Sequence, residues 1–170
     1  MKDKRPPFEV ARSQDAIYVR VVGLGSMATA PTFEAFADRA IAEGALQFVV
    51  DLADCTGVDS TFMGLLLTIS NRLREADGED PRGCVLINVD DHALKQLRSV
   101  GVDAFVTIKA GKTALPRALT LTELSATAVD DKTRLKLMVR AHKELVAADA
   151  RNRAKFGAFL EGIVAELADA

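Results

Sequence analysis

The sequence predicts an α/β domain with a mainly parallel sheet, followed by a helical extension. Two short apolar runs, residues 48–52 and 84–88, have the length and the β-branched side chains of strands that are buried on both faces. Each run is followed by a stretch with the apolar spacing of a helix. Strands that alternate with helices in this way form βαβ units. We therefore expect a mixed sheet of about four or five strands with helices mainly on one face.

The segment before the first helix is expected to be a β-hairpin. Residues 8–12 and 16–22 alternate or run apolar, and three polar residues between them suit a turn. Residues 23–30 are expected to form a loop. A helix is expected over 32–43, because Pro31 favours the first turn of a helix. Its buried face is predicted to carry Phe33, Phe36, Ala37, Ala40 and Ile41.

The longest apolar helix of the domain is expected to begin at Ser60. Before it, the chain is expected to turn through Asp54, Thr56 and Gly57. Ser60 is a candidate N-cap, because its hydroxyl can accept a hydrogen bond from a free amide of the first turn. The predicted buried face consists of Phe62, Met63, Leu66, Ile69, Ser70 and Leu73.

The remaining elements of the domain are shorter. A loop is expected over 76–82, before the second apolar strand. A helix capped by Asp90 or Asp91 and a short strand over 105–108 should follow. Residues 115–121 fit either a helical turn or an edge strand.

These elements divide the chain into four parts. Residues 1–7 are an N-terminal tail, 8–122 the α/β domain, 123–130 a linker of small residues and 131–170 a helical extension. The extension has side chains spaced three and four apart, close to a heptad pattern. They are Leu135, Met138, His142, Leu145, Asp149, Asn152, Phe156, Phe159 and Ile163.

One long helix and two helices meeting near residues 149–150 are both compatible with the extension, since Asp149 and Asn152 interrupt its apolar stripe. Such a stripe is too apolar to remain in water. We expect residues 131–170 to pack against a second chain, most simply in a homodimer. The competing expectation is that they fold back onto the free face of the domain's own sheet.

Composition excludes several classes of protein. A net charge of −2 without a cluster of Lys and Arg argues against nucleic-acid binding, and no apolar run is long enough to span a membrane. The N-terminus lacks the apolar region of a signal peptide, so a cytoplasmic location is expected. Cys55 and Cys84 lack the spacing of a metal or redox site. No metal or cofactor is expected.

Two other motifs offer alternatives. The run 23–28 fits a dinucleotide-binding fingerprint, which leaves a nucleotide-binding domain as a hypothesis from a different class. Pro31 argues against it, because it falls inside the helix that the fingerprint requires. Catalysis by Ser60 would need a base, and the only histidines are His92, at a helix start, and His142, on the face of a helix in the extension.

The central strand and the helix after it resemble the signature of the STAS family, named for sulfate transporters and anti-sigma factor antagonists. The resemblance covers about residues 8–121 and rests on Asp51-Leu52 at the end of the strand, followed by Val58-Asp59-Ser60-Thr61-Phe62-Met63-Gly64. The chain departs from the family at Phe62, where Gly is usual. It also has Gly23-Leu24-Gly25-Ser26 where the family carries an acidic stretch.

The resemblance implies the STAS fold and the function of an anti-sigma factor antagonist. Such a protein binds a serine-kinase anti-sigma factor while the serine at the position of Ser60 is unphosphorylated, and a phosphatase can reverse the modification. Thr61 is the fallback acceptor. A phosphate here would add to the charges expected from Asp51, Asp54 and Asp59, and so would weaken binding. The implied partner-binding residues are Asp59, Ser60, Thr61, Phe62, Met63 and Gly64. A STAS scaffold or transporter-associated module that is never phosphorylated is the alternative.

Overall fold

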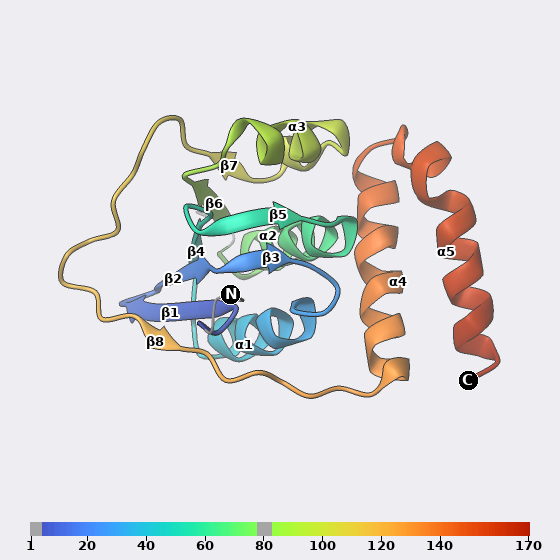
Figure 1. Cartoon of the computed structure of the whole chain (residues 1–170), viewed down its shortest axis with the longest axis horizontal. Coiled ribbons are helices and arrows are strands. Elements are labelled where there is room, and N and C mark those ends of the chain that lie inside the picture. The colour runs from blue at the N-terminus through green and yellow to red at the C-terminus, as the bar shows by residue number, and fades with distance from the viewer. Residues whose placement is uncertain (1–4, 78–82) are drawn as a thin grey trace.

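The computed structural model describes residues 5–77 and 83–170, arranged as a sheet backed by successive layers of helices (Figure 1). The elements in chain order are β1 (Phe8–Ser13), β2 (Ala16–Val21), β3 (Gly23–Gly25), α1 (Ala30–Ala42), β4 (Gln47–Asp51), β5 (Cys55–Val58), α2 (Ser60–Asp77), β6 (Gly83–Ile87), α3 (Asp91–Ser99), the 3-10 turn η1 (Val102–Ala104), β7 (Thr107–Ile108), β8 (Thr122–Glu123), α4 (Asp131–Ala148) and α5 (Asn152–Ala168).

The main sheet confirms the predicted fold class and is larger than predicted. It has six strands in the order β7-β6-β4-β2-β1-β8. The strands β2, β4, β6 and β7 are parallel, and β1 is antiparallel to both of its neighbours. The sixth strand, β8, was not expected as a strand, because Thr122 and Glu123 pair with β1 through only two residues. Such a short pairing leaves no alternating pattern in the sequence.

A second, two-stranded sheet corrects two expectations. The predicted loop 23–30 begins with strand β3, and the predicted turn through Asp54, Thr56 and Gly57 lies largely within strand β5. These two strands pair in parallel, with a shift in register after Gly23. Short strands rich in glycine show no side-chain alternation, which explains why the sequence indicates turns here.

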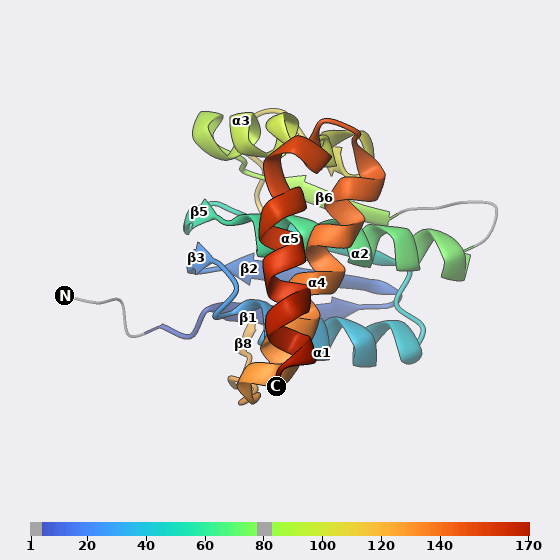
Figure 2. The same ribbon diagram turned by 90° about the vertical axis from the view of Figure 1, so that its right-hand side faces the viewer.

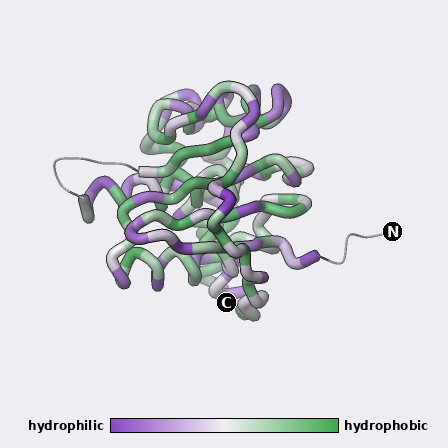
Figure 3. Tube along the Cα trace, turned by 90° about the vertical axis from the view of Figure 1, so that its left-hand side faces the viewer, coloured by the Kyte–Doolittle hydropathy of each residue, from purple (hydrophilic) through white to green (hydrophobic). Residues whose placement is uncertain are grey.

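The helices α1 and α2 cover one face of the main sheet, while the segment 109–121 crosses the opposite face, seen in Figure 3. Four phenylalanine rings form the centre of the core, in contact across the sheet–helix boundary: Phe8, Phe33, Phe48 and Phe62. Helix α2 extends to Asp77, so the start of the predicted loop 76–82 is helical. Residues 78–82 of that prediction lie outside the described residues.

The extension forms two helices, of which α4 runs across α2 and α5 lies on the outer side of α4 (Figures 1 and 2). We call α4 and α5 together the C-terminal hairpin. Leu137 and Leu145 of α4 join the main core, while Met138, Val139 and Ile163 form a small cluster between the two helices. The hairpin therefore packs on the helical layer of its own chain. It does not lie on the free face of the sheet, as the competing expectation had it.

This packing buries most of the stripe that led us to expect a homodimer, which stays a prediction. Asn152 is the first residue of α5 and is fully buried. Its Nδ2 donates to the carbonyl oxygens of Val100 at 2.8 Å and Leu145 at 2.7 Å. Asp149 accepts from the Arg151 backbone and side chain, which lowers the pKa of Asp149 to about 2. None of the helices in the described part of the chain is long and apolar enough to cross a membrane.

Candidate functional site

Ser60 lies in the first turn of α2, and its neighbour Asp59 caps the helix. One carboxylate oxygen of Asp59 accepts from the Phe62 amide at 2.9 Å, as an N-cap does, and the other accepts from the Met27 amide at 2.8 Å. The expectation that Ser60 is the N-cap was therefore wrong. Asp59 takes this role because its second oxygen also ties down the loop before α1, which a serine hydroxyl one residue later cannot do.

The Ser60 hydroxyl is instead bonded to a histidine of the C-terminal hairpin. Its Oγ lies 2.9 Å from Nε2 of His142, and the other ring nitrogen, Nδ1, lies 2.7 Å from the carbonyl oxygen of Met138. A carbonyl oxygen only accepts, so Nδ1 carries the proton of the neutral ring and Nε2 accepts from the Ser60 hydroxyl. The fold thus brings together two residues that are 82 positions apart.

His142 is fully buried under α5, where its ring makes edge contacts with those of Phe156 and Phe159. Burial lowers the pKa of His142 below its ordinary value of 6.5, although the Met138 carbonyl and the Asp59 carboxylate act in the opposite direction. The imidazole that faces Ser60 is therefore held in its neutral form. The expectation that His142 merely occupies a helix face missed this contact.

Helices α2 and α4 meet closely at Gly64. A Cβ atom added at Gly64 would lie 2.4 Å from the carbonyl oxygen of Ala141, so only glycine allows the two backbones to approach this far. A second contact joins Asn71 Nδ2 to Glu144 Oε2 at 3.0 Å. The hairpin thus contacts the same helix face that carries Ser60.

The residues implied as partner-binding are mostly buried in this conformation. Thr61, Phe62 and Met63 have almost no exposed surface, and Gly64 is covered by α4, while Ser60 and Asp59 are half-buried. Phe62, which replaces the usual glycine, packs with the core rings and lies directly against Gly25. Partner binding by this whole set stays a prediction, and as folded only Asp59 and Ser60 reach the surface.

The three acidic residues expected around Ser60 do not form one negative surface. Asp51 is 3% exposed, and its carboxylate faces Arg20 at 3.4 Å. Asp54 forms an ion pair with Arg5 at 3.0 Å. The expected acidic surface is therefore reduced to Asp59, and its carboxylate is occupied by two backbone amides.

The geometry of residues 26–29 does not favour the nucleotide-binding alternative. In a dinucleotide site, the amides of the glycine-rich turn point at phosphate. Here the Met27 amide donates to Asp59, and the amides of Ser26 and Ala28 donate to the hydroxyls of Thr29 and Ser26. Among the residues that the structure describes, no group of three His, Cys, Asp or Glu side chains could hold a metal ion.

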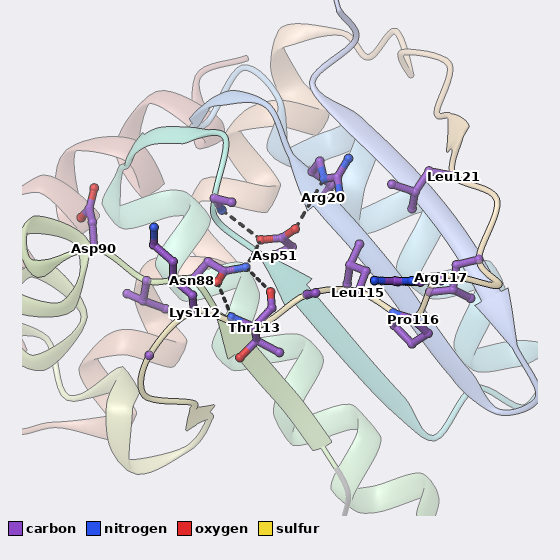
Figure 4. A pocket seen from close by; sticks show the side chains of 15 residues that line it. Arg20, Asp51, Asn88, Asp90, Lys112, Thr113, Leu115, Pro116, Arg117 and Leu121 are labelled. Atoms are coloured by element: carbon purple, nitrogen blue, oxygen red, sulfur yellow. Dashed lines mark hydrogen bonds and ion pairs between the residues drawn. The ribbon is translucent and has the colours of Figure 1, made fainter.

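A cavity that the sequence did not indicate lies between the main sheet and segment 109–121. It has a volume of about 1090 Å³ and is lined by Arg20, Asp51, Ala53, Asn88, Val89, Asp90, Gly111, Lys112, Thr113, Ala114, Leu115, Pro116, Arg117, Leu119 and Leu121 (Figure 4). Ser60 and His142 are not among its lining residues, so the cavity is a candidate site separate from Ser60.

Comparison with known proteins gives a family and a fold. The sequence model of the STAS domain matches residues 7–113, which excludes the C-terminal hairpin. The structure of the anti-sigma factor antagonist SpoIIAA in its unphosphorylated form is similar, with a TM-score of 0.52 and 20% identity over 61% of this chain and 88% of that one. No curated protein matches the sequence.

A second similar fold is that of TM1081 from Thermotoga maritima. Its crystal structure has a TM-score of 0.53 and 17% identity, over 59% of this chain and 84% of that one. Its NMR structure has a TM-score of 0.52 and 16% identity, over 64% and 83%. With the family match over more than half of its length, the chain belongs to the STAS domain family.

Proposed function

We propose that this chain is a phosphorylation-controlled protein-binding module of the anti-sigma factor antagonist type, with Ser60 as the phosphate acceptor. The observation that carries the proposal is the place of Ser60 in the first turn of α2, directly after the capping residue Asp59. The expected partner is a serine-kinase anti-sigma factor, which binds the unphosphorylated surface. A phosphatase would restore that surface, and Thr61 is the fallback acceptor.

The position suits a phosphate chemically. The first turn of a helix presents amide groups and the positive end of the helix dipole, both of which stabilise an added dianion. The domain can therefore carry the modification without unfolding. A binding partner that had matched the neutral serine would meet a new charge of about −1.5 to −2 and would lose complementarity.

Exposed apolar side chains beside Ser60 support a docking surface there. Leu24 is 54% exposed and Met27 is 45% exposed, although both are large hydrophobic residues. Met27 belongs to the loop that the Asp59 carboxylate ties to the start of α2, and Leu24 belongs to strand β3, where the Gly25 carbonyl oxygen accepts from the Asp59 amide. Exposed apolar side chains that are rimmed by polar groups are typical of interaction surfaces.

The C-terminal hairpin has to be displaced for this surface to work fully. With Oγ of Ser60 2.9 Å from Nε2 of His142, three phosphate oxygens have no room between the two groups. The closed hairpin and a phosphate in this position therefore exclude each other. We infer that the kinase partner competes with α4 for the face of α2 that carries Ser60.

The pair of Ser60 and His142 also has the parts of a nucleophile and its base. Two features favour binding over catalysis. His142 has no exposed surface, and its acceptor nitrogen faces Ser60 beneath the two rings of α5. A substrate would reach the hydroxyl in a reactive position only after the hairpin had moved away, which would remove the base as well.

Mass spectrometry of the protein isolated from its native cells tests the acceptor. We expect one phosphate on Ser60, removable by a phosphatase, absent from Ser60→Ala and retained in the matched variant Thr61→Val. A phosphate that persists on Thr61 in Ser60→Ala would transfer the role to Thr61. An unmodified Ser60 under all growth conditions would contradict the proposal and favour the alternative, a STAS scaffold that is never phosphorylated.

Binding is tested by calorimetry with the purified kinase partner. The phosphorylated protein and Ser60→Asp should bind more weakly than Ser60→Ala, because both carry negative charge in the first turn. The phosphorylated protein is the cleaner comparison, since Asp has less charge than phosphate. Equal affinities for all three forms would rule out a switch.

A further inference from the structure

The cavity under segment 109–121 lies where ligands bind in many α/β proteins. Arg20, Asp51 and Asn88 stand at the carboxyl ends of β2, β4 and β6, which run in parallel and therefore end at the same edge of the sheet. Sites in open α/β sheets form outside the carboxyl ends of such strands. The volume, about 1090 Å³, is that of a site for a small organic molecule.

The segment that closes the cavity is long and irregular. Between β7 and β8 it contains no helix or strand, and Asn88 fastens it to the sheet edge. The Asn88 side chain donates to the Thr113 carbonyl oxygen at 2.9 Å and accepts from the Thr113 amide at 2.8 Å. Its Nδ2 also donates to Asp51 at 2.8 Å. Irregular loops of this length in compact domains are usually functional.

The charges lining the cavity leave an excess of cations. Asp51 is balanced by Arg20 and also accepts from the Ala53 amide and from Asn88, so its carboxylate is fully used. Asp90, at the far side of the cavity, caps α3 through the Ala93 amide. Within residues 5–77 and 83–170, neither Lys112 nor Arg117 has an acidic partner or a hydrogen bond.

Arg117 stands next to an apolar wall. Figure 4 shows its side chain running toward Leu115, on the same side of the cavity as Arg20 and Leu121, while Lys112 lies at the other side near Asp90. Leu119 also lines the cavity. A cation that runs toward Leu115, in a cavity also lined by Leu119 and Leu121, matches a ligand that has a negative group at one end and an apolar body.

We propose that this cavity binds a small organic anion with an apolar body, and that Arg117, supported by Arg20, contacts the anionic group. The apolar part lies on Leu115, Leu119 and Leu121. Arg20 has hydrogen-bonding capacity to spare, because its contacts with Asp51 and Glu9 are both long, at 3.4 Å. This site is independent of Ser60 and of the function proposed for it.

NMR titration of the full chain with octanoate tests the proposal, with octanamide as a neutral probe of nearly the same shape. Octanoate should produce saturable shifts in residues 113–121 and in Arg20, and octanamide should bind at least fivefold more weakly. Arg117→Met should weaken octanoate at least fivefold. Lys109→Met, which removes an exposed lysine outside the cavity, should leave the affinity unchanged, and Lys112→Met should have the smaller effect of the two cavity variants.

Several outcomes would overturn the proposal. These are the absence of saturable shifts in segment 113–121, equal binding of the charged and neutral probes, and an octanoate titration of Arg117→Met that superimposes on that of the unmodified protein. A well-dispersed spectrum of Arg117→Met before titration shows that this variant is folded. Because Arg117 is exposed at the rim of the cavity, its replacement should not disturb the core.

Discussion

The two faces of the six-stranded sheet are covered in different ways. On one face α1 and α2, backed by the C-terminal hairpin, form a continuous core, whereas on the other the irregular segment 109–121 leaves a cavity of about 1090 Å³. The hairpin makes its own helical hydrogen bonds and has a small cluster of its own, so we expect it to dock or detach as a unit. The segment is held at the sheet edge by Asn88 and by the Lys109 amide, which donates to the Leu86 carbonyl oxygen, so we expect it to adjust only locally.

A matched pair of leucine variants should show the largest difference in stability between the C-terminal hairpin and segment 109–121. Leu145 on α4 is fully buried in the main core, while Leu119 on the segment is half-buried. Leu145→Ala should lower the free energy of unfolding by about 2–5 kcal/mol. Leu119→Ala should lower it by less than about 1 kcal/mol. Urea unfolding measures both, and equal losses would mean that the segment is as tightly packed as the hairpin.

A matched pair of glycine variants should separate the hairpin from the domain. The Cβ atom of Gly64→Ala would meet the Ala141 carbonyl oxygen, and overpacking of this kind costs about 1–3 kcal/mol. Hydrogen exchange should become faster in α4 and α5 and stay slow in β4. Gly157→Ala is the control, because its Cβ meets nothing within 4 Å and alanine favours a helix. Faster exchange throughout β4 in Gly64→Ala would show that the hairpin does not open independently.

Removing the Ser60 hydroxyl should have a smaller effect of the same kind. In Ser60→Ala the buried Nε2 of His142 loses its hydrogen-bond donor, which should cost about 1–3 kcal/mol, toward the lower end because Ser60 is only half-buried. The control Ser99→Ala removes an exposed hydroxyl that donates to Gln96, and should change stability by about 0.5 kcal/mol or less. If urea unfolding gives the same value for both, the contact with His142 does not hold the hairpin.

The smallest expected effect is a pH dependence carried by the hairpin. Because the pKa of His142 is lowered in the folded protein, the unfolded chain takes up a proton below pH 6.5 that the folded chain does not. The stability that depends on neutral His142 is therefore complete above pH 6.5 and is lost as the pH falls. Urea unfolding at pH 7.5 and 5.5 should show this loss, and His142→Gln should reduce it. An identical loss in His142→Gln would assign it to other groups.

The elements formed by local pattern could be predicted from the sequence. The hairpin of β1 and β2, the continuous apolar strands β4 and β6 and the start of α2 each show a clear apolar pattern with a clear boundary. The short strands β3, β5 and β8 could not be predicted, since they are held by pairing with distant residues. Asp59 and Ser60 are both good capping residues, and the choice depends on Met27, which approaches only in the folded chain.

The sequence also shows that residues 131–170 must bury an apolar stripe, but it does not show against what. Two residues of the sequence indicate where the stripe packs. His142 occupies an apolar position, where a polar ring needs a hydrogen-bonding partner. Gly64 stands inside an otherwise strong helix, where glycine is unfavourable unless another backbone comes close. His142 alone does not show that α2 is its neighbour, and Gly64 alone does not show that α4 is.

The linker that joins the C-terminal hairpin to the domain sets a concentration that any partner needing the face of α2 must exceed. Residues 124–130 keep a detached hairpin near the domain, at an effective concentration in the millimolar range. If the hairpin is open in about one molecule in a hundred, a partner's apparent dissociation constant rises about a hundredfold. A partner at low abundance would then leave the chain closed, and one that accumulates past this concentration would engage it. Thus the abundance of the partner, as well as phosphate on Ser60, would decide when the chain responds.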